Sequence, residues 1–328
     1  MEEVLERFSK MNVLVIGDIM LDRYLIGDVE RISYEAPVPI VKLERQKSWN
    51  VPGGAGNVAI NLSLLAVNNV YLFGRVGPDV SGKTLLAKFN VMPNVNVQFV
   101  RSDPGTLTTL KTRLVAKHQQ IVRFDLEDTS PLIPQAEDKV IWALETIVPT
   151  TQGVIISDYN KGFLTYRLLK YLSSACTHHK IPVFIDPSPT TPYPTFSNAT
   201  ILPNIVEAKE MSGLGPVDKS SIEKVGKVLM DKFGAVLITL GADGMILFQG
   251  ENVIKVPPVS VEDVVDTVGA GDTVVSVFSL AKICGANLEK AATIASIAAS
   301  IAIKRVGTYA VSFKELYEEV HNFSRSGG

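Results

Sequence analysis

The stretch Asp266–Ile283, "DTVGAGDTVVSVFSLAKI", sets three small residues before a strongly apolar run. The apolar run predicts a buried helix with Gly269, Ala270 and Gly271 at its N-terminus. Backbone N–H groups in the first turn of a helix lack partners within it and attract anions. Asp272 would then stand beside a bound phosphoryl group. The alternative is structural, because Asp is also a good N-capping residue.

A second glycine cluster, "PGGAGNVAINLSLLAV", occupies Pro52–Val67. Taken alone, Gly54, Gly56 and Ala59 fit the G-x-G-x-x-G/A dinucleotide fingerprint, which requires a buried strand before it. The residues upstream, "ERQKSWNV", are polar instead. A pair of glycines before a helix, with Asn57 in its first turn, therefore favours backbone and amide contacts to a polyhydroxylated ligand.

A third cluster, "GRVGPDVSGKTLL" at Gly74–Leu86, matches the G-x-x-x-x-G-K-[ST] pattern of a P-loop from Gly77 to Thr84. A P-loop wraps its backbone N–H groups around phosphate while its lysine reaches the outer phosphates. Here the wrapped segment would include Asp79, whose carboxylate repels phosphate. The alternative interpretation is a turn and helix start with a solvated Lys83.

A pair of polar residues follows another apolar strand in "PNIVEAKE". Asn204 and Glu207 are three residues apart, so on a helix they share a face. They are candidates for contacts to a ligand at the end of that strand. The alternative for Asn204 is a plain helix cap.

The order of apolar runs predicts the fold class. Runs such as "NVLVIGD", "NVYLFGRV", "GVIISDY", "IPVFIDP" and "AVLITLG" alternate with amphipathic stretches. This alternation predicts an α/β fold with a mainly parallel sheet and helices on both faces, and with ligands at the carboxyl ends of the strands. Two polar, β-prone segments, at about 24–50 and 95–125, interrupt the pattern and are predicted to form a small β lid. We expect one domain over 1–328.

The composition disfavours several classes of protein. With 328 residues and 46% hydrophobic content, the chain is expected to bury a substantial core. A formal net charge of -2 gives no broad attraction to nucleic acid or to an anionic membrane. The N-terminal "MEEVLERFSKMN" is unlike a signal peptide, and the late apolar segment "AATIASIAASIAIKR" is too short to span a bilayer. Two distant cysteines, Cys176 and Cys284, show no metal-type spacing. The sequence therefore favours a cytoplasmic protein.

The motifs together resemble a known family. "GGAGNVA" and "DTVGAGDT" are similar to the two signatures of the ribokinase-like, or PfkB, carbohydrate kinases, in the expected order, and "NIVE" is similar to that family's N-x-x-E element. The resemblance covers essentially the whole chain. It implies a ribokinase-like, three-layer, doubly wound and mainly parallel sheet with a small β lid. It also implies that the P-loop pattern is a coincidence.

Further strings resemble one branch of this family, the heptose 7-phosphate kinases of bacterial ADP-heptose biosynthesis. They are "GDIMLDRYLIGDVERISYEAPVPIV", "LKTRLVAKHQQIVRFDLE" and "SDYNKG". This resemblance implies that ATP phosphorylates D-glycero-β-D-manno-heptose 7-phosphate at its anomeric hydroxyl, a step towards lipopolysaccharide precursors. Another sugar kinase, acting on fructose 6-phosphate or ribose, is an alternative within the family. A non-catalytic sugar- or nucleotide-binding regulator is an alternative of a different class.

The family resemblance also implies roles for individual residues. Asp272 would be the general base, and Gly269, Ala270 and Gly271 would form the anion hole. Asn204 and Glu207 would act near the triphosphate and its Mg²⁺, with Glu207 reaching the metal through water. The nucleotide would be lined by Thr239, Gly241 and Gly244. The sugar hydroxyls would be held by Asp18, Gly53, Gly54 and Asn57.

A sugar phosphate requires positive charge, which Arg and Lys supply. The candidates are Lys111, Arg113, Arg123 and Lys161, and alternation along a strand lets Lys111 and Arg113 share a face. The alternative for each is a solvated surface charge. One departure weakens the pattern, because Ser188 follows the Asp-Pro of "IDP" where related heptose kinases often have a lysine.

Two expectations concern the assembly. The chain shows no H-x-G-H motif and ends at Gly328, so no nucleotidyltransferase domain is expected within it. Exposed lid strands present open edges, which pairing with a second subunit would cover. The resemblance points to the same homodimer, joined through the lids. A monomer with charge-protected edges is the alternative.

Overall fold

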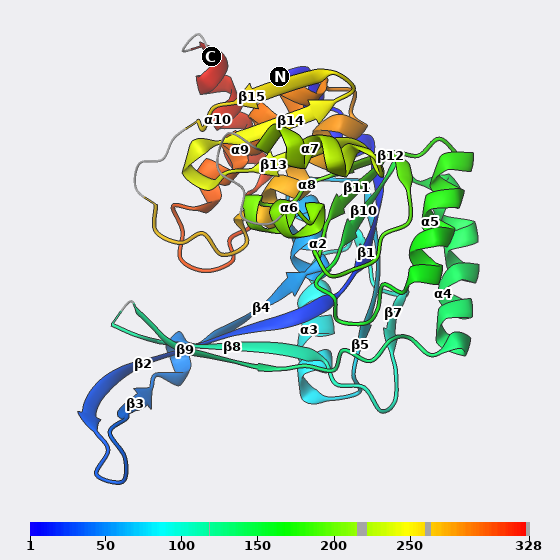
Figure 1. The fold of residues 1–328 in the computed structure, drawn as a ribbon. Coiled ribbons are helices and arrows are strands. Elements are labelled where there is room, and N and C mark those ends of the chain that lie inside the picture. The colour runs from blue at the N-terminus through cyan, green and yellow to red at the C-terminus, as the bar shows by residue number, and fades with distance from the viewer. Residues whose placement is uncertain (118, 215–221, 260–263, 326–328) are drawn as a thin grey trace.

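The computed structural model describes residues 1–117, 119–214, 222–259 and 264–325. It consists of an α/β body from which a small separate sheet, the lid, projects (Figure 1). The sheet of the body has the order β15 (Asn252–Val256), β14 (Met245–Gln249), β13 (Phe233–Thr239), β12 (Phe196–Ile201), β11 (Val183–Asp186), β10 (Gly153–Ser157), β1 (Asn12–Gly17), β5 (Asn69–Val76) and β6 (Val95–Asn96), with β7 (Val100–Ser102) also beside β5. Strands β13–β14 and β14–β15 pair antiparallel, whereas the other pairs are parallel.

Helices cover both faces of this sheet, which explains why its central strands are apolar on both sides. In β1, Val13 and Val15 enter one core, while Leu14 and Ile16 enter the other. The first core is packed by α1 (Glu2–Leu5), α2 (Ala55–Leu64), α3 (Val80–Phe89), α8 (Ala270–Ile283), α9 (Leu288–Ala302) and α10 (Phe313–Arg325). The second is packed by α4 (Pro134–Ile147), α5 (Tyr166–His178), α6 (Ile205–Ser212) and α7 (Ile222–Met230). The predicted three-layer α/β fold is confirmed.

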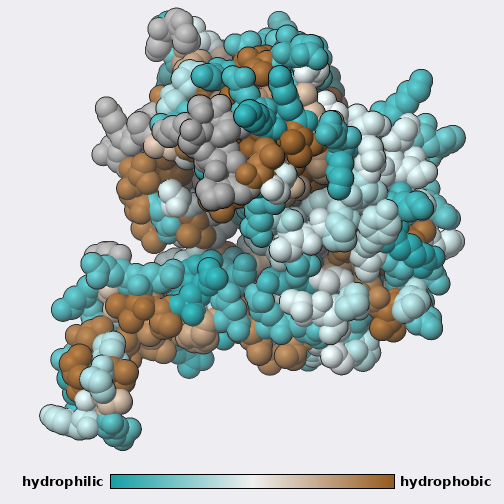
Figure 2. Space-filling model, in the orientation of Figure 1, coloured by the Kyte–Doolittle hydropathy of each residue, from teal (hydrophilic) through white to brown (hydrophobic). Residues whose placement is uncertain are grey.

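The lid is a five-stranded sheet built around one long strand. Strand β2 (Ile19–Ile32) pairs antiparallel with β3 (Pro39–Leu43) and β4 (Trp49–Gly54), and parallel with β8 (Thr109–Ala116), which pairs with β9 (Gln119–Leu126). Figure 2 shows hydrophobic side chains gathered on this lid. Every residue of β9 is exposed, including the apolar Val122 and Phe124.

The predicted lid boundaries, about 24–50 and 95–125, need correction. The lid begins at Ile19 and includes residues up to Gly54, and its second part starts at Thr109. The start of β2 was missed because Ile19, Met20 and Leu21 are fully buried and look like core. Strands β6 and β7 belong to the body, at the sheet edge, where half-exposed strands have the same mixed polarity as a lid.

The P-loop-like stretch forms a turn and a helix start, as its alternative interpretation predicted. Asp79 caps α3, because its carboxylate accepts hydrogen bonds from the Gly82 N–H at 2.7 Å and the Thr108 N–H at 2.8 Å. A Cβ atom added at Gly82 would lie 2.3 Å from the Gly77 carbonyl oxygen, so glycine is needed for this close approach. Lys83 is exposed on α3.

Among the described residues, none of the helices combines the length and apolar character needed to cross a membrane. The apolar segment "AATIASIAASIAIKR" contributes to α9, whose small residues pack closely in the first core.

We expect Lys83→Ala to leave ATP affinity and kcat/KM within about twofold, because Lys83 lies on an exposed helix face. Gly82→Ala should instead lower the melting temperature, since overpacking typically costs about 1–3 kcal/mol. Differential scanning fluorimetry and steady-state kinetics on both variants separate these effects. A tenfold loss of kcat/KM for Lys83→Ala at unchanged melting temperature would restore the P-loop interpretation.

Candidate functional site

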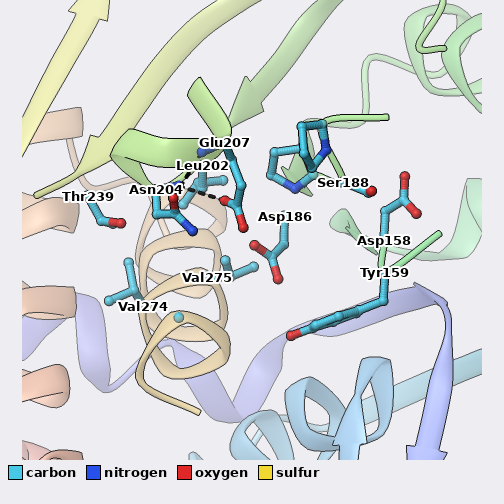
Figure 3. Close-up of a pocket in the computed structure, with 13 residues that line it drawn as sticks. Asp158, Tyr159, Asp186, Ser188, Leu202, Asn204, Glu207, Thr239, Val274 and Val275 are labelled. Carbon is cyan, nitrogen blue, oxygen red and sulfur yellow. Dashed lines mark hydrogen bonds between the residues drawn. The ribbon is translucent and has the colours of Figure 1, made fainter. Parts of the chain in front are cut away.

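A cleft of about 320 Å³ lies at the carboxyl ends of the central strands, where an α/β sheet places its ligands (Figure 3). The loops after β10, β11 and β12, the end of β13 and the start of α8 form its walls. Its lining residues are Asp158, Tyr159, Asp186, Pro187, Ser188, Pro189, Leu202, Asn204, Glu207, Thr239, Gly271, Val274 and Val275.

The cleft is acidic. Burial raises the pKa of Asp158, Asp186 and Glu207 above their ordinary values, and for Asp186 the negative charges of Asp272 and Glu207 add to the rise. None of the described lining residues is Lys or Arg. Ser188 is buried, and its N–H donates to the Tyr193 hydroxyl at 3.1 Å. A polyanion entering this cleft therefore needs a cation brought with it.

An apolar cavity of about 300 Å³ adjoins the cleft and shares Thr239, Gly271 and Val274 with it. Its lining is mostly apolar, with Met245, Ala299 and Ile303 among the contributors. Apolar walls suit an aromatic base, and the polar cleft beside them suits a phosphate chain. Of the residues expected at the nucleotide, this cavity is lined by Thr239, Gly241 and Gly244.

Asn204 and Glu207 form a reciprocal capping box at the start of α6. The Asn204 Oδ1 accepts from the N–H groups of Val206 at 2.8 Å and Glu207 at 3.0 Å, and Glu207 Oε2 accepts from the Asn204 N–H at 2.8 Å. The capping alternative for Asn204 is thus confirmed, yet both side chains also line the cleft (Figure 3). The capping bond from the Asn204 N–H engages Oε2 of the Glu207 carboxylate. No group of three or more His, Cys, Asp or Glu side chains among the described residues could hold a metal ion directly.

Asp272 lies in the first turn of α8 with its side chain buried. Its Oδ2 accepts a hydrogen bond from Asn57 Nδ2 at 2.7 Å, and its Oδ1 accepts one from the Tyr159 hydroxyl at 3.0 Å. Burial raises the pKa of Asp272 to about 6, against the lowering effect of these two donors. The carboxylate is therefore ionised at neutral pH and able to accept a proton.

The N-terminus of α8 differs in one respect from the expected anion hole. The Ala270 N–H donates to the Thr267 carbonyl at 3.2 Å, so the expectation of a free N–H at Ala270 is wrong. A tight turn before the helix uses this donor. Within the described part of the chain, the N–H groups of Gly271 and Asp272 have no acceptor. A Cβ atom on Gly271 would meet nothing within 4 Å, so the backbone there is open to a ligand.

The residues expected at the sugar lie together beyond Asp272. The Asp18 carboxylate accepts from the N–H groups of Tyr159 at 2.9 Å and Lys161 at 3.0 Å, and burial raises its pKa to about 6. A Cβ atom on Gly54, whose φ is +58°, would lie 2.4 Å from the Asp18 carbonyl oxygen. One on Gly53 would lie 2.2 Å from Asp22 Oδ2. Both glycines are therefore required by close packing.

Three of the four expected cations are already paired. Arg113 forms a buried ion pair with Asp22, and the two others pair more openly, Lys161 with Glu127 at 2.7 Å and Arg123 with Asp125 at 3.2 Å. Lys111 has no ion-pair partner among the described residues. Its Nζ lies 5.0 Å from the centroid of the Tyr159 ring, and burial lowers its pKa.

Tyr159 and Asp22 were missed by sequence reasoning. Tyr159 follows β10 within "SDYNKG", a string in which only Lys161 was selected. Its place just beyond the carboxyl end of a central strand was the available signal. Asp22 lies inside the string "GDIMLDRYLIGDVERISYEAPVPIV", from which only Asp18 is selected, and nothing in the sequence marks its ion pair with Arg113.

Comparison with known proteins decides the family. Residues 10–315 match the model of the pfkB family carbohydrate kinases. The chain belongs to this family. It is 39% identical to the "Bifunctional protein HldE" of Geobacter metallireducens over 96% of its own length, and 36% identical to that of Gluconobacter oxydans over 97%. It spans only 64% and 66% of the lengths of these two relatives.

Solved structures show the same fold. Arabidopsis thaliana ribokinase complexed with ribose and ATP superposes with a TM-score of 0.74 at 21% identity, covering 94% of this chain and 98% of that one. Escherichia coli phosphofructokinase-2 in complex with substrates and products gives 0.74 at 20% identity, covering 96% and 99%. The expected ribokinase-like architecture is confirmed.

Asp272→Asn should stabilise the protein at neutral pH. A carboxyl group whose pKa rises from 3.8 to about 6 on folding favours the folded state below about pH 4, and this contribution is lost as the pH rises through 6. The gain on removing the charge is at most about 3 kcal/mol. Melting temperatures of the variant and wild type should differ by a few degrees at pH 7.5 and converge near pH 4.

Asp79→Asn is the matched control, and its effect on stability at neutral pH should have the opposite sign. Burial raises the pKa of Asp79, but the N–H donors Thr108 and Gly82 outweigh this and lower it overall. This variant should lose stability at neutral pH. An Asp272→Asn variant that melts below wild type at pH 7.5 would contradict the desolvation argument.

Proposed function

We propose that this chain transfers the γ-phosphoryl group of ATP to the anomeric hydroxyl of D-glycero-β-D-manno-heptose 7-phosphate, giving the 1,7-bisphosphate used in ADP-heptose biosynthesis. The observation that carries the proposal is the position of Asp272. Its buried carboxylate lies between the two adjoining cavities, which together suit a nucleotide, and the sugar-site candidates Asp18, Gly53 and Gly54. The strings that resemble heptose 7-phosphate kinases, together with the similarity to the HldE relatives, support the choice of sugar. A cytoplasmic location, where ATP is available, is part of the proposal.

Transfer then needs positioning more than covalent chemistry. Asp272 takes the proton from the sugar hydroxyl while the hydroxyl oxygen bonds to the γ-phosphorus of ATP. The bond between the γ-phosphorus and the bridging oxygen breaks, and that oxygen leaves with ADP. The N–H groups of Gly271 and Asp272 face the charge that develops on the phosphoryl oxygens. A pKa of about 6 keeps the base ionised at pH 7 while still basic enough to accept the proton.

Mg²⁺ bound with ATP is the expected cofactor. The acidic cleft lined by Asp158, Asp186 and Glu207 has no described Lys or Arg to balance the triphosphate. Glu207 lines this cleft and would hold the metal through a bound water. When bound, the metal would neutralise phosphate charge and orient the γ-phosphoryl group.

Lys111 is the strongest candidate for contact with an anionic group of the bound substrates. Its ammonium group is partly desolvated and has no ion-pair partner among the residues that the structure describes, so an incoming phosphate would restore the interactions that burial removed. Arg113, Arg123 and Lys161 hold carboxylates of the protein instead.

A substrate panel tests the reaction. We expect ATP consumption with heptose 7-phosphate to exceed that with fructose 6-phosphate, ribose or adenosine by orders of magnitude in kcat/KM. Asp272→Asn should lower turnover about 10²–10⁴-fold, the usual worth of a general base, while ATP binding is retained. Preference for an unphosphorylated sugar would remove the heptose assignment. Binding of sugar and ATP without turnover in the wild type would favour a non-catalytic regulator.

Lys111→Met should reduce kcat/KM for the sugar phosphate by about tenfold or more, because it removes a charge-assisted contact worth about 1.5–3 kcal/mol. Arg123→Met is the control, since Arg123 is half exposed and already paired with Asp125. Equal losses in both variants would show that general surface charge, and not a specific contact, attracts the substrate.

We further propose a homodimer joined through the lids. The exposed apolar side chains of the lid are Ile32, Tyr34, Val38, Leu43, Ile121, Val122, Phe124 and Leu126. They gather on one projecting sheet with open edges (Figure 2), which a second copy of the chain would cover. The same contact would place one lid against the other near each sugar site.

Light scattering at micromolar concentration should give twice the 35.6 kDa of one chain. Phe124→Asp should shift the mass towards the monomer by placing a charge in the contact, whereas Val91→Asp, on the exposed end of the body after α3, should not. A wild-type mass of one chain would exclude the dimer.

A further inference from the structure

Tyr159 lies where the body, the lid and the base meet. Its backbone N–H donates to Asp18, its hydroxyl donates to Asp272, and its ring faces the Lys111 ammonium group. The ring also packs against the backbone at Gly54, since a Cβ atom added there would lie 3.3 Å from Tyr159 Cδ2. In Figure 3 its hydroxyl end is directed towards the start of α8.

The two donors fix the Asp272 carboxylate from opposite elements. Asn57 reaches Oδ2 from α2, and its side chain is held by Asn61, whose Nδ2 donates to Asn57 Oδ1 at 3.3 Å. Tyr159 reaches Oδ1 from the loop after β10, and its own backbone is held by Asp18. With one donor on each oxygen, rotation of the carboxylate breaks a hydrogen bond. Each oxygen still has a lone pair available for a substrate proton.

We propose that Tyr159 is a positioning residue for phosphoryl transfer. Its hydroxyl holds Asp272 in the orientation that receives the proton, and its ring provides the surface on which the lid residue Lys111 rests. The inference rests on the proposed role of Asp272 as the base. The loop "SDYNKG" would then serve both sites, because its backbone holds Asp18 and its Tyr159 side chain holds Asp272 at the start of α8.

The groups around Asp272 affect its pKa, so a change in the Tyr159 hydrogen bond can be followed in the pH dependence of kcat. Asp22 on β2 and Asp186 on β11 oppose its ionisation, whereas Lys111 on β8 favours it. The Tyr159 hydroxyl, together with Asn57, offsets the effect of burial. The pKa of Tyr159 itself is raised well above its ordinary value by burial and by the charge of Asp272, so the hydroxyl remains a donor at all working pH values.

The test is the pH profile of kcat for Tyr159→Phe, with ATP and the sugar phosphate that supports turnover in the panel. Phe keeps the ring that fills the space and contacts Gly54. Losing one hydrogen bond to a buried carboxylate should move the acid limb of the profile upward by about one pH unit. From a limb near pH 6, kcat at pH 6 would fall about fivefold more than kcat at pH 8.5. The KM for the sugar should change less than about twofold, because the ring remains in place.

Tyr193→Phe is the matched control. Tyr193 also donates its hydroxyl to a buried carboxylate, that of Asp158, but makes no contact with Asp272. Its acid limb should coincide with that of wild type. Each profile is normalised to its own maximum, so a difference in the amount of folded protein cancels.

The outcomes separate this inference from the proposed function. If Asp272→Asn is inactive and the acid limb of the pH profile stays in place in Tyr159→Phe, the role of Tyr159 is overturned while the proposed function stands. Retained activity in Asp272→Asn overturns the base and, with it, the positioning role. An equal shift in Tyr159→Phe and Tyr193→Phe would assign the effect to a general change of the cleft and also overturn the proposal.

Discussion

Burying the Asp272 carboxylate costs free energy that hydrogen-bond donors and nearby positive charge can offset only in part. The donors come from α2 and from the loop after β10, and the positive charge comes from Lys111 on the lid. Three elements distant in sequence must therefore converge on the first turn of α8. Because the pKa remains raised to about 6, the compensation is incomplete, and the site is less stable than an uncharged one would be. The protein retains in this carboxylate the basicity that proton transfer requires.

The parallel sheet makes this convergence possible. Strands β10, β11, β12 and β13 end side by side, so the polar residues that follow them meet at one edge. Close backbone approach between neighbouring strands of the sheet also positions residues of the site. Gly17 is an example, because a Cβ atom there would lie 1.9 Å from the Ser157 carbonyl oxygen. That glycine lets the end of β1 lie against β10 and places Asp18 beside the loop that carries Tyr159.

Sequence reasoning recovered the elements with strong local signals. The apolar runs of the central strands and the glycine-rich helix starts carry their conformations in adjacent residues. Gly271 and Asn204, both selected from the family motifs, line the same cleft. It was less successful where tertiary contacts decide. The buried start of β2 resembles core, and the contacts of Tyr159 join residues more than 40 positions away. Pairing of Arg113 with Asp22 likewise spans 91 positions and has no local pattern. The bond of the Ala270 N–H is different, because its acceptor, the Thr267 carbonyl, lies in a local turn.

Strand β2 connects the body to the outer end of the lid. Its first residues, Ile19, Met20 and Leu21, are buried in the body. Ile32 lies exposed at the far end of the same strand, beyond a register shift against β3 between Val29 and Arg31. Thirteen steps of about 3.3 Å give a length along the strand of roughly 43 Å, which is the upper limit of the arm because β2 is curved (Figure 1). A rotation of about 5° near Asp18 would move the tip by at most roughly 4 Å and shift Asp22 by about 1 Å, by the same strand geometry. Small displacements of the strand beside the sugar site would thus become larger at the outer end of the lid. A contact that holds the outer end in place would, in turn, restrict the motion of Asp22 at the site.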